Sequence, residues 1–263
     1  MKVDWRVKMT ELEFMINFHK DNKRQGPGST EDTLKALNFM NLDQEKTYKV
    51  ADIGCGTGAQ TLTLAENING EITAIDLFPQ VLEKLNFNAK AHGLEDKINT
   101  RNESMEDLSF EKESFDIIWS EGAIYIMGFE AGIKAWKQFL KPEGYIAISE
   151  ITWLTKDRPK AIEDYWNNEY TEMATASNKI KILEENGFMP IGFFVLPESS
   201  WTDYYYIPME KRFDEFLKKH NHSEIVKKMI DQTKEEIKMY NKYKDFLSYG
   251  FYIAKKSSSN KNI

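Results

Sequence analysis

The sequence predicts an α/β fold, a doubly wound and mostly parallel sheet of seven strands with helices on both faces. Short apolar runs alternate with segments of helical character from residue 47 to residue 151, which is typical of such a sheet. A turn with three glycines follows the first apolar run, and an acidic residue ends the second. Open sheets of this kind bind ligands at the carboxyl ends of their strands, so we expect the site there.

The composition fits one soluble domain. The chain has 263 residues, 41% of them apolar, enough for one large core in residues 1–255 with a flexible tail at 256–263. A net charge of −7 argues against nucleic acid as a partner. One cysteine, no apolar run long enough for membrane insertion and a charged N-terminus predict a cytoplasmic protein.

Residues 1–46 are expected to form N-terminal helices. Leu12, Met15 and Phe18 share one face of a short amphipathic helix over 10–19. Residues 21–30 are rich in turn formers, and Ser29 or Thr30 is a suitable N-cap for a second helix that runs through 36–40.

Residues 47–151 carry the regular alternation. The predicted strands are 48–53, 71–76, 98–102, 115–120 and 145–150, and the predicted helices are 61–66, 79–92 and 129–140. The segment Lys141–Gly144 is predicted to be a turn into the fifth strand.

Residues 152–255 are expected to form the acceptor-side half. A helix over 180–186 stops at Gly187, and a strand over 188–196 follows. Residues 201–244 are predicted to be a helical insertion before the last strand at 251–254.

The glycine turn, with Gly54, Gly56 and Gly58, predicts a cofactor site. Glycine tolerates positive φ and allows a ligand to approach the main chain, and N–H groups that are free at the helix start favour an anionic group. Asp76 ends the next strand about 20 residues later, where adenosine-binding folds place a carboxylate for the ribose hydroxyls.

Two ligands fit this pattern. Gly54, Gly56 and Ala59 match the spacing of a dinucleotide site, so a nicotinamide-dependent oxidoreductase is the alternative reading. Asp52 favours a different, cationic ligand that contains adenosine. A carboxylate at this place would oppose a pyrophosphate but suit an ammonium and a sulfonium group.

Residues Val50–Gly58 resemble the first motif of the class I S-adenosylmethionine-dependent methyltransferases, and Phe139–Tyr145 resembles their approach to the fifth strand. The central block is most similar to the ubiquinone and menaquinone C-methyltransferase branch. The resemblance implies a Rossmann-like methyltransferase fold, S-adenosyl-L-methionine as cofactor and a small-molecule acceptor, for which a quinone-like compound is one candidate. A protein that binds the cofactor without catalysis is a further alternative.

In relatives, a segment like Arg24–Ser29 covers the cofactor, although an ordinary turn fits equally well. We predict a set of cofactor-binding residues from the motifs and the resemblance: Gln25, Gly26, Asp52, Gly54, Gly56, Thr57, Gly58, Gln60, Asp76, Leu77, Ser104, Met105 and Ser120. Many relatives have an acid at the position of Ser104, so the adenine contact here is expected from Met105 or from the Glu103 carboxylate.

No catalytic residue is assigned from the sequence. Glu121, Tyr125 and Glu150 are the candidates, since they lie at or near strand ends, and His19 is a further possible base. The four histidines lack the spacing of a metal site. A homodimer is left open as an alternative to a monomer.

Overall fold

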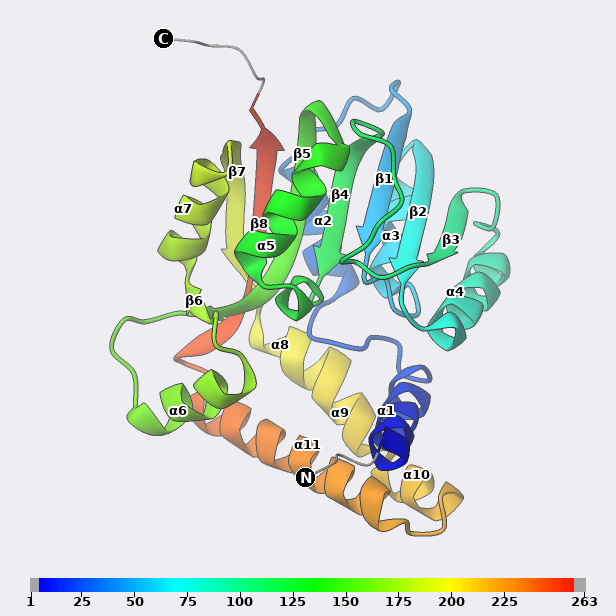
Figure 1. The fold of residues 1–263 in the computed structure, drawn as a ribbon, viewed down its shortest axis with the longest axis vertical. Coiled ribbons are helices and arrows are strands. Elements are labelled where there is room, and N and C mark those ends of the chain that lie inside the picture. The colour runs from blue at the N-terminus through cyan, green and yellow to red at the C-terminus, as the bar shows by residue number, and fades with distance from the viewer. Residues whose placement is uncertain (1–4, 258–263) are drawn as a thin grey trace.

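The computed structural model describes residues 5–257, with side chains described from residue 11. Its eight strands form one sheet in the order β3-β2-β1-β4-β5-β8-β7, and β6 pairs with β5 (Figure 1). The strands are β1 (Tyr48–Ile53), β2 (Gly70–Asp76), β3 (Ile98–Asn102), β4 (Phe115–Glu121), β5 (Leu140–Trp153), β6 (Ala174–Thr175), β7 (Phe188–Val195) and β8 (Leu247–Lys256).

The strand order reverses between β1 and β4, which are parallel neighbours although β2 and β3 lie between them in the chain. Only β8 runs antiparallel, to β5 on one side and β7 on the other. The predicted doubly wound and mostly parallel sheet is confirmed. The two-residue strand β6 is the addition that the sequence pattern did not predict, since so short a strand leaves no periodicity. A reversal of this kind opens a crevice at the carboxyl ends of the strands.

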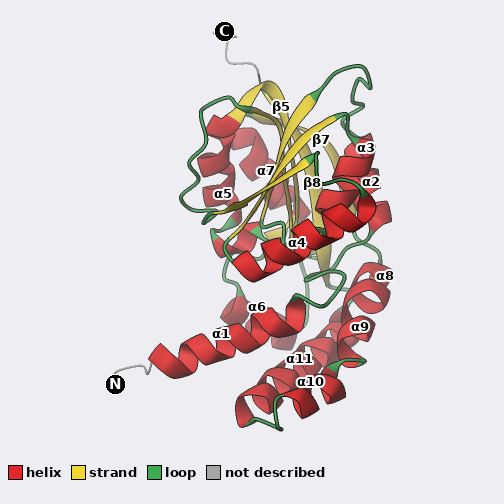
Figure 2. Cartoon of the chain, turned by 90° about the vertical axis from the view of Figure 1, so that its right-hand side faces the viewer, coloured by secondary structure: helices red, strands yellow, loops and turns green. Residues whose placement is uncertain are grey.

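Each face of the sheet has its own core. On one face, leucines and alanines of α2 (Thr30–Asn38), α3 (Ala59–Asn67) and α4 (Pro79–His92) pack against β1 and β2. On the other face, α5 (Phe129–Trp136) and α7 (Ala176–Glu185) cover β4 and β5. Figure 2 shows the sheet edge-on between these two layers of helices.

A separate helical layer lies beyond the carboxyl ends of the parallel strands (Figures 1 and 2). Its members are α1 (Trp5–His19), α6 (Lys160–Glu169), α8 (Glu198–Trp201), a π-helical turn η3 (Thr202–Tyr206), α9 (Ile207–Glu210), α10 (Phe213–Lys219) and α11 (Glu224–Tyr243). Aromatic side chains from all of these elements except α9 meet in a third core, to which α9 contributes Met209. The predicted helical insertion therefore covers the end of the sheet where ligands are expected.

Some boundaries differ from the prediction. The helix expected over 129–140 ends at Trp136, and a 3-10 turn η2 (Lys137–Phe139) leads into β5. The segment Lys141–Gly144 belongs to β5, where a bulge lets Phe115 pair with Leu140 and Ile117 with Tyr145. Helix α6 was not predicted. None of the described helices combines the length and the apolar character that a membrane crossing needs.

Candidate functional site

The glycine turn connects β1 to α3 at the reversal point of the sheet. All three glycines have positive φ, +76° at Gly54, +53° at Gly56 and +86° at Gly58. A Cβ on Gly54 would lie 2.4 Å from the Cβ of Ala123, and one on Gly58 would lie 2.0 Å from Leu85 Cδ1. The sequence has glycine here because both the backbone conformation and the space exclude a side chain.

The backbone N–H groups of this turn all have protein acceptors. Gly54 and Cys55 both donate to the Ile75 carbonyl at 2.9 Å, and Gly58 donates to the Cys55 carbonyl at 3.0 Å. Gly56 donates to Asp76 Oδ2 at 3.0 Å and Thr57 donates to Gln25 Oε1 at 2.9 Å. The N–H groups of residues 54–58 are therefore used by the neighbouring strand, the N-terminal segment and the turn itself, whereas the expected free donors are those at the start of α3, which begins at Ala59.

Asp76 closes β2 beside the turn. Its Oδ2 accepts from Gly56 N and its Oδ1 accepts from Phe78 N, both at 3.0 Å. Burial raises the pKa of this carboxyl group, and the two N–H donors oppose the shift. Each carboxylate oxygen has a second lone pair, so Asp76 can hold the turn and still accept from ligand hydroxyls.

Asp52 lies fully buried below the turn. Gln60 Nε2 donates to its Oδ1 at 3.3 Å, and the Thr61 hydroxyl donates to its Oδ2 at 2.5 Å. Burial raises the pKa of Asp52 to about 7, against the lowering effect of the Thr61 hydrogen bond. The carboxylate thus joins β1 to the first turn of α3. Its oxygens are bonded to Gln60 and Thr61, so it would influence a cationic ligand only from beneath the glycine turn.

This buried carboxyl group predicts a pH-dependent stability. Its pKa is about 7 in the folded chain and about 4 when unfolded, so the folded state binds the extra proton between these values. Stability contributed by Asp52 is therefore present at acidic pH and lost as the pH rises through about 7. We expect the difference between the melting temperatures of Asp52→Asn and the wild type to shift in favour of the variant as the pH rises from 5.5 to 8. If the melting temperatures of the two proteins change with pH in parallel, the raised pKa of Asp52 is refuted.

The N-terminal segment lies directly on the glycine turn. Gln25 Nε2 donates to the Thr57 hydroxyl at 2.7 Å and to the carbonyls of His19 and Asn22 at 3.1 and 3.3 Å. A Cβ on Gly56 would lie 2.2 Å from Gln25 Oε1. The Gln25 amide therefore connects the end of α1 to the glycine turn.

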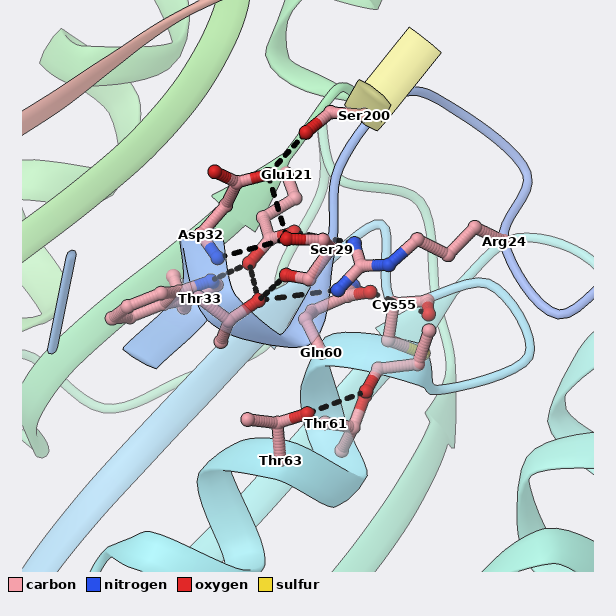
Figure 3. Close-up of polar contacts among 12 residues, drawn as sticks. Arg24, Ser29, Asp32, Thr33, Cys55, Gln60, Thr61, Thr63, Glu121 and Ser200 are labelled. Carbon is pink, nitrogen blue, oxygen red and sulfur yellow. Dashed lines mark hydrogen bonds and ion pairs between the residues drawn. The ribbon is translucent and has the colours of Figure 1, made fainter. Parts of the chain in front are cut away.

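A buried ion pair holds the same segment against β4 (Figure 3). Arg24 Nη1 donates to Glu121 Oε2 at 2.8 Å, and both side chains are less than one-tenth exposed. Glu121 Oε1 also accepts from the Thr33 hydroxyl at 2.7 Å and from Trp119 Nε1 at 2.9 Å. Both oxygens of the Glu121 carboxylate thus accept hydrogen bonds. Those from Arg24 and Thr33 hold the N-terminal segment and α2 against β4.

The remaining predicted cofactor residues fall into two groups. Met105 lies over the turn, with Cε 3.4 Å from a Cβ on Gly54, and Gly26 faces open space. Leu77 is 56% exposed at the end of β2. Ser120 and Gln60 are buried instead. The Ser120 hydroxyl donates to the Ile53 carbonyl, and the Gln60 amide donates to the Cys55 carbonyl.

The region after β3 differs in one respect from our expectation. The Glu103 carboxylate accepts from Ser109 N and Oγ, both at 3.1 Å, and pairs with Arg101. It is therefore engaged in local contacts. Ser104 is half-buried, and its hydroxyl accepts from Glu106 N at 3.3 Å.

The other catalytic candidates have unequal access. Glu150 is buried, pairs with Lys179 and accepts from the Tyr170 hydroxyl at 2.5 Å. Tyr125 is 46% exposed and lies next to Tyr170, with 6.1 Å between the ring centroids. Burial, followed by the charge of Arg212, lowers the pKa of His19 to about 4, which keeps its ring neutral.

Sequence reasoning missed the contacts that join the N-terminal segment to the sheet. Arg24, Thr33 and Trp119 have no periodicity or spacing that connects them, because they are brought to Glu121 by the tertiary fold. Among the described residues, no group of three or more His, Cys, Asp or Glu side chains is arranged to hold a metal ion.

Comparison with known proteins identifies the family. Residues 44–212 match the family model described as a methyltransferase domain. The chain is 27% identical over 186 residues to an uncharacterized protein of Haemophilus influenzae, which covers 69% of the chain and 72% of that protein. It is 24% identical to the sterol 24-C-methyltransferase of Candida albicans, over 60% of the chain but only 41% of that enzyme.

A solved structure shows the same fold. The methyltransferase from Geobacter sulfurreducens in complex with S-adenosyl-L-homocysteine superposes with a TM-score of 0.80 at 17% identity, over 92% of this chain and 97% of that one. The family match decides against the dinucleotide alternative. This chain belongs to the class I S-adenosylmethionine-dependent methyltransferases.

Proposed function

We propose that this methyltransferase acts on a small-molecule acceptor, bound between the glycine turn and the helical layer. The observation that carries the proposal is that the glycine turn and Asp76 lie at the sheet end that the helical insertion covers. A covered site suits an acceptor that can enter it whole. When bound, S-adenosylmethionine supplies a methyl group that is already activated on its sulfonium.

The described residues would perform two tasks. Asp76 and Met105, with the three glycines, hold the adenosyl group. Gln25 and the pair Arg24–Glu121 keep the N-terminal segment over the turn and exclude water from it. Methyl transfer depends mainly on alignment of donor and acceptor, so this positioning is the main contribution of the protein.

The catalytic candidates take different parts in this proposal. Glu121 and Glu150 are occupied by Arg24 and Lys179, so we assign them positioning roles. Tyr125 is partly exposed, and among the described residues its hydroxyl forms no hydrogen bond. Burial raises the pKa of Tyr125, which makes it a hydrogen-bond donor toward an acceptor and not a base.

A labelling experiment tests the proposal. The purified chain is incubated with S-adenosylmethionine labelled in its methyl group and with a bacterial extract separated into low-mass and macromolecular fractions. Label is expected in the low-mass fraction only. Label transferred to protein or nucleic acid would overturn the small-molecule assignment, and no transfer despite cofactor binding would favour the non-catalytic alternative. A quinone-like acceptor rests on the family resemblance alone, and adding menaquinone precursors to the assay tests it directly.

A further inference from the structure

Glu236 on α11 is a sheltered carboxylate that has no cationic partner among the side chains the structure describes. Its residue is only partly exposed, and burial raises the pKa of the side chain. The Tyr206 hydroxyl donates to its Oε1 at 2.9 Å. In the part of the chain whose side chains are described, no lysine or arginine pairs with it, whereas Glu224 and Glu235 on the same helix pair with Lys227 and Lys238.

Tyr206, which donates to this carboxylate, belongs to a group of aromatic rings. The rings of Tyr205 and Tyr206 are 5.1 Å apart, and Tyr206 lies 5.8 Å from Trp201. Burial, followed by the charge of Glu236, raises the pKa of Tyr125 and of Tyr205. We call Tyr125, Tyr205, Tyr206, Tyr249, Trp201 and Glu236 the tyrosine cluster. Its members come from the turn after β4, the helical insertion and β8.

The tyrosine cluster adjoins the cofactor turn. Tyr249 lies 5.1 Å from the Trp201 ring, and its Cε2 is 3.0 Å from the place of a Cβ on Gly122. The next residue, Ala123, is the one that excludes a side chain from Gly54. Two consecutive residues after β4 thus contact the cofactor turn on one side and the tyrosine cluster on the other.

This combination of groups selects for positive charge. A partly buried carboxylate that lacks a counter-ion is costly, and a ligand cation would relieve that cost. The faces of tyrosine and tryptophan rings attract ammonium groups, and aromatic surfaces joined to a carboxylate are a recurrent way to bind them. A neutral quinone would gain nothing from the carboxylate.

We propose that the methyl acceptor carries an ammonium group, which binds between Glu236 and the aromatic rings of the tyrosine cluster. The inference rests on the proposed function for the statement that the ligand is the methyl acceptor. The binding of a cation by the cluster stands on the contacts of Glu236 themselves.

Calorimetry with a matched pair of probes tests the inference. Choline and its uncharged isostere 3,3-dimethylbutan-1-ol are titrated into the full chain in the presence of S-adenosylhomocysteine. We expect choline to bind about tenfold more tightly than the alcohol. Glu236→Gln retains an acceptor for the Tyr206 hydroxyl and should remove the preference for choline. Glu235→Gln, one residue away and paired with Lys238, is the control that should keep it.

The outcomes separate the two proposals. Equal affinities for choline and the alcohol, binding of neither probe, or an unchanged choline affinity in Glu236→Gln would each overturn the cation site. Melting temperatures of both variants are measured alongside to show that they are folded. Absence of S-adenosylhomocysteine binding, with the choline preference intact, would instead overturn the proposed function and leave the cation site standing.

Discussion

Replacing Lys179 by methionine should lower the free energy of unfolding by about 3–5 kcal/mol at pH 7.5. The Lys179 and Glu150 side chains are 0% and 1% exposed and pair with each other, and Lys179 Nζ also lies 4.6 Å from the centre of the Phe129 ring. Without the ammonium group, Glu150 would keep only the Tyr170 hydroxyl as a side-chain donor. Urea unfolding monitored by circular dichroism measures the loss.

Two further variants make this result specific. The double variant Glu150→Gln with Lys179→Met should recover much of the lost stability, because it leaves no buried charge. Lys181→Met on the same helix breaks only the exposed pair with Glu185 and should change stability by less than about 1 kcal/mol. A cost for Lys179→Met as small as that for Lys181→Met would contradict the buried ion pair.

The pH dependence of Lys179→Met has a defined sign. Burial already raises the pKa of Glu150, and losing the neighbouring cation would raise it further. The folded variant then takes up a proton that the unfolded chain does not, so its deficit is largest above the folded pKa. The deficit should shrink as the pH falls toward the unfolded value of about 4.3.

Replacing Asp76 by alanine should weaken the binding of S-adenosylhomocysteine by about 1–3 kcal/mol. Two effects act together, since the ligand hydroxyls lose an acceptor and the N–H groups of Gly56 and Phe78 lose theirs. Titration calorimetry measures the affinity. Asp76→Asn, which can still accept one N–H, should show a smaller loss.

Glu71→Ala provides the control for this second prediction. Glu71 is exposed on the same strand, β2, and lies away from the glycine turn. Its replacement should leave the affinity within experimental error of the wild type. Wild-type affinity in Asp76→Ala would remove Asp76 from the cofactor site.

The sequence revealed the parts of the site that are local in the chain. The turn from Gly54 to Gly58 was visible because positive φ restricts residue choice, and β2 with Asp76 follows at the distance that one helix requires. The end of β2 at Asp76 was predicted correctly, whereas β5 continues beyond the predicted end at Glu150 to Trp153. The break of α5 at Trp136 was missed, because the 3-10 turn after it has no distinct composition.

The parts that were missed depend on contacts between distant segments. Asp52 was recognised as a negative charge, but its burial under Gln60 and Thr61 follows from how α3 returns over β1. Glu121 was predicted as a catalytic candidate. In the fold its carboxylate instead pairs with Arg24, which lies 97 residues away in the chain. Glu236 has no feature in the sequence that separates it from the other acidic residues of 201–244, and only the fold places Tyr206 beside it.

The way β7 and β8 meet has a consequence for how such a protein can diversify. Val195 and Gly250 are paired across the two strands, and Leu196 N donates to the Tyr249 carbonyl at 2.9 Å. The whole excursion from residue 197 to residue 246 therefore leaves and re-enters the sheet at neighbouring points. Lengthening, shortening or exchanging that excursion would strain neither strand, and the entropy of closing a longer loop grows only slowly with length. Under the proposed function, changes in this excursion would alter the acceptor site and leave the glycine turn unchanged.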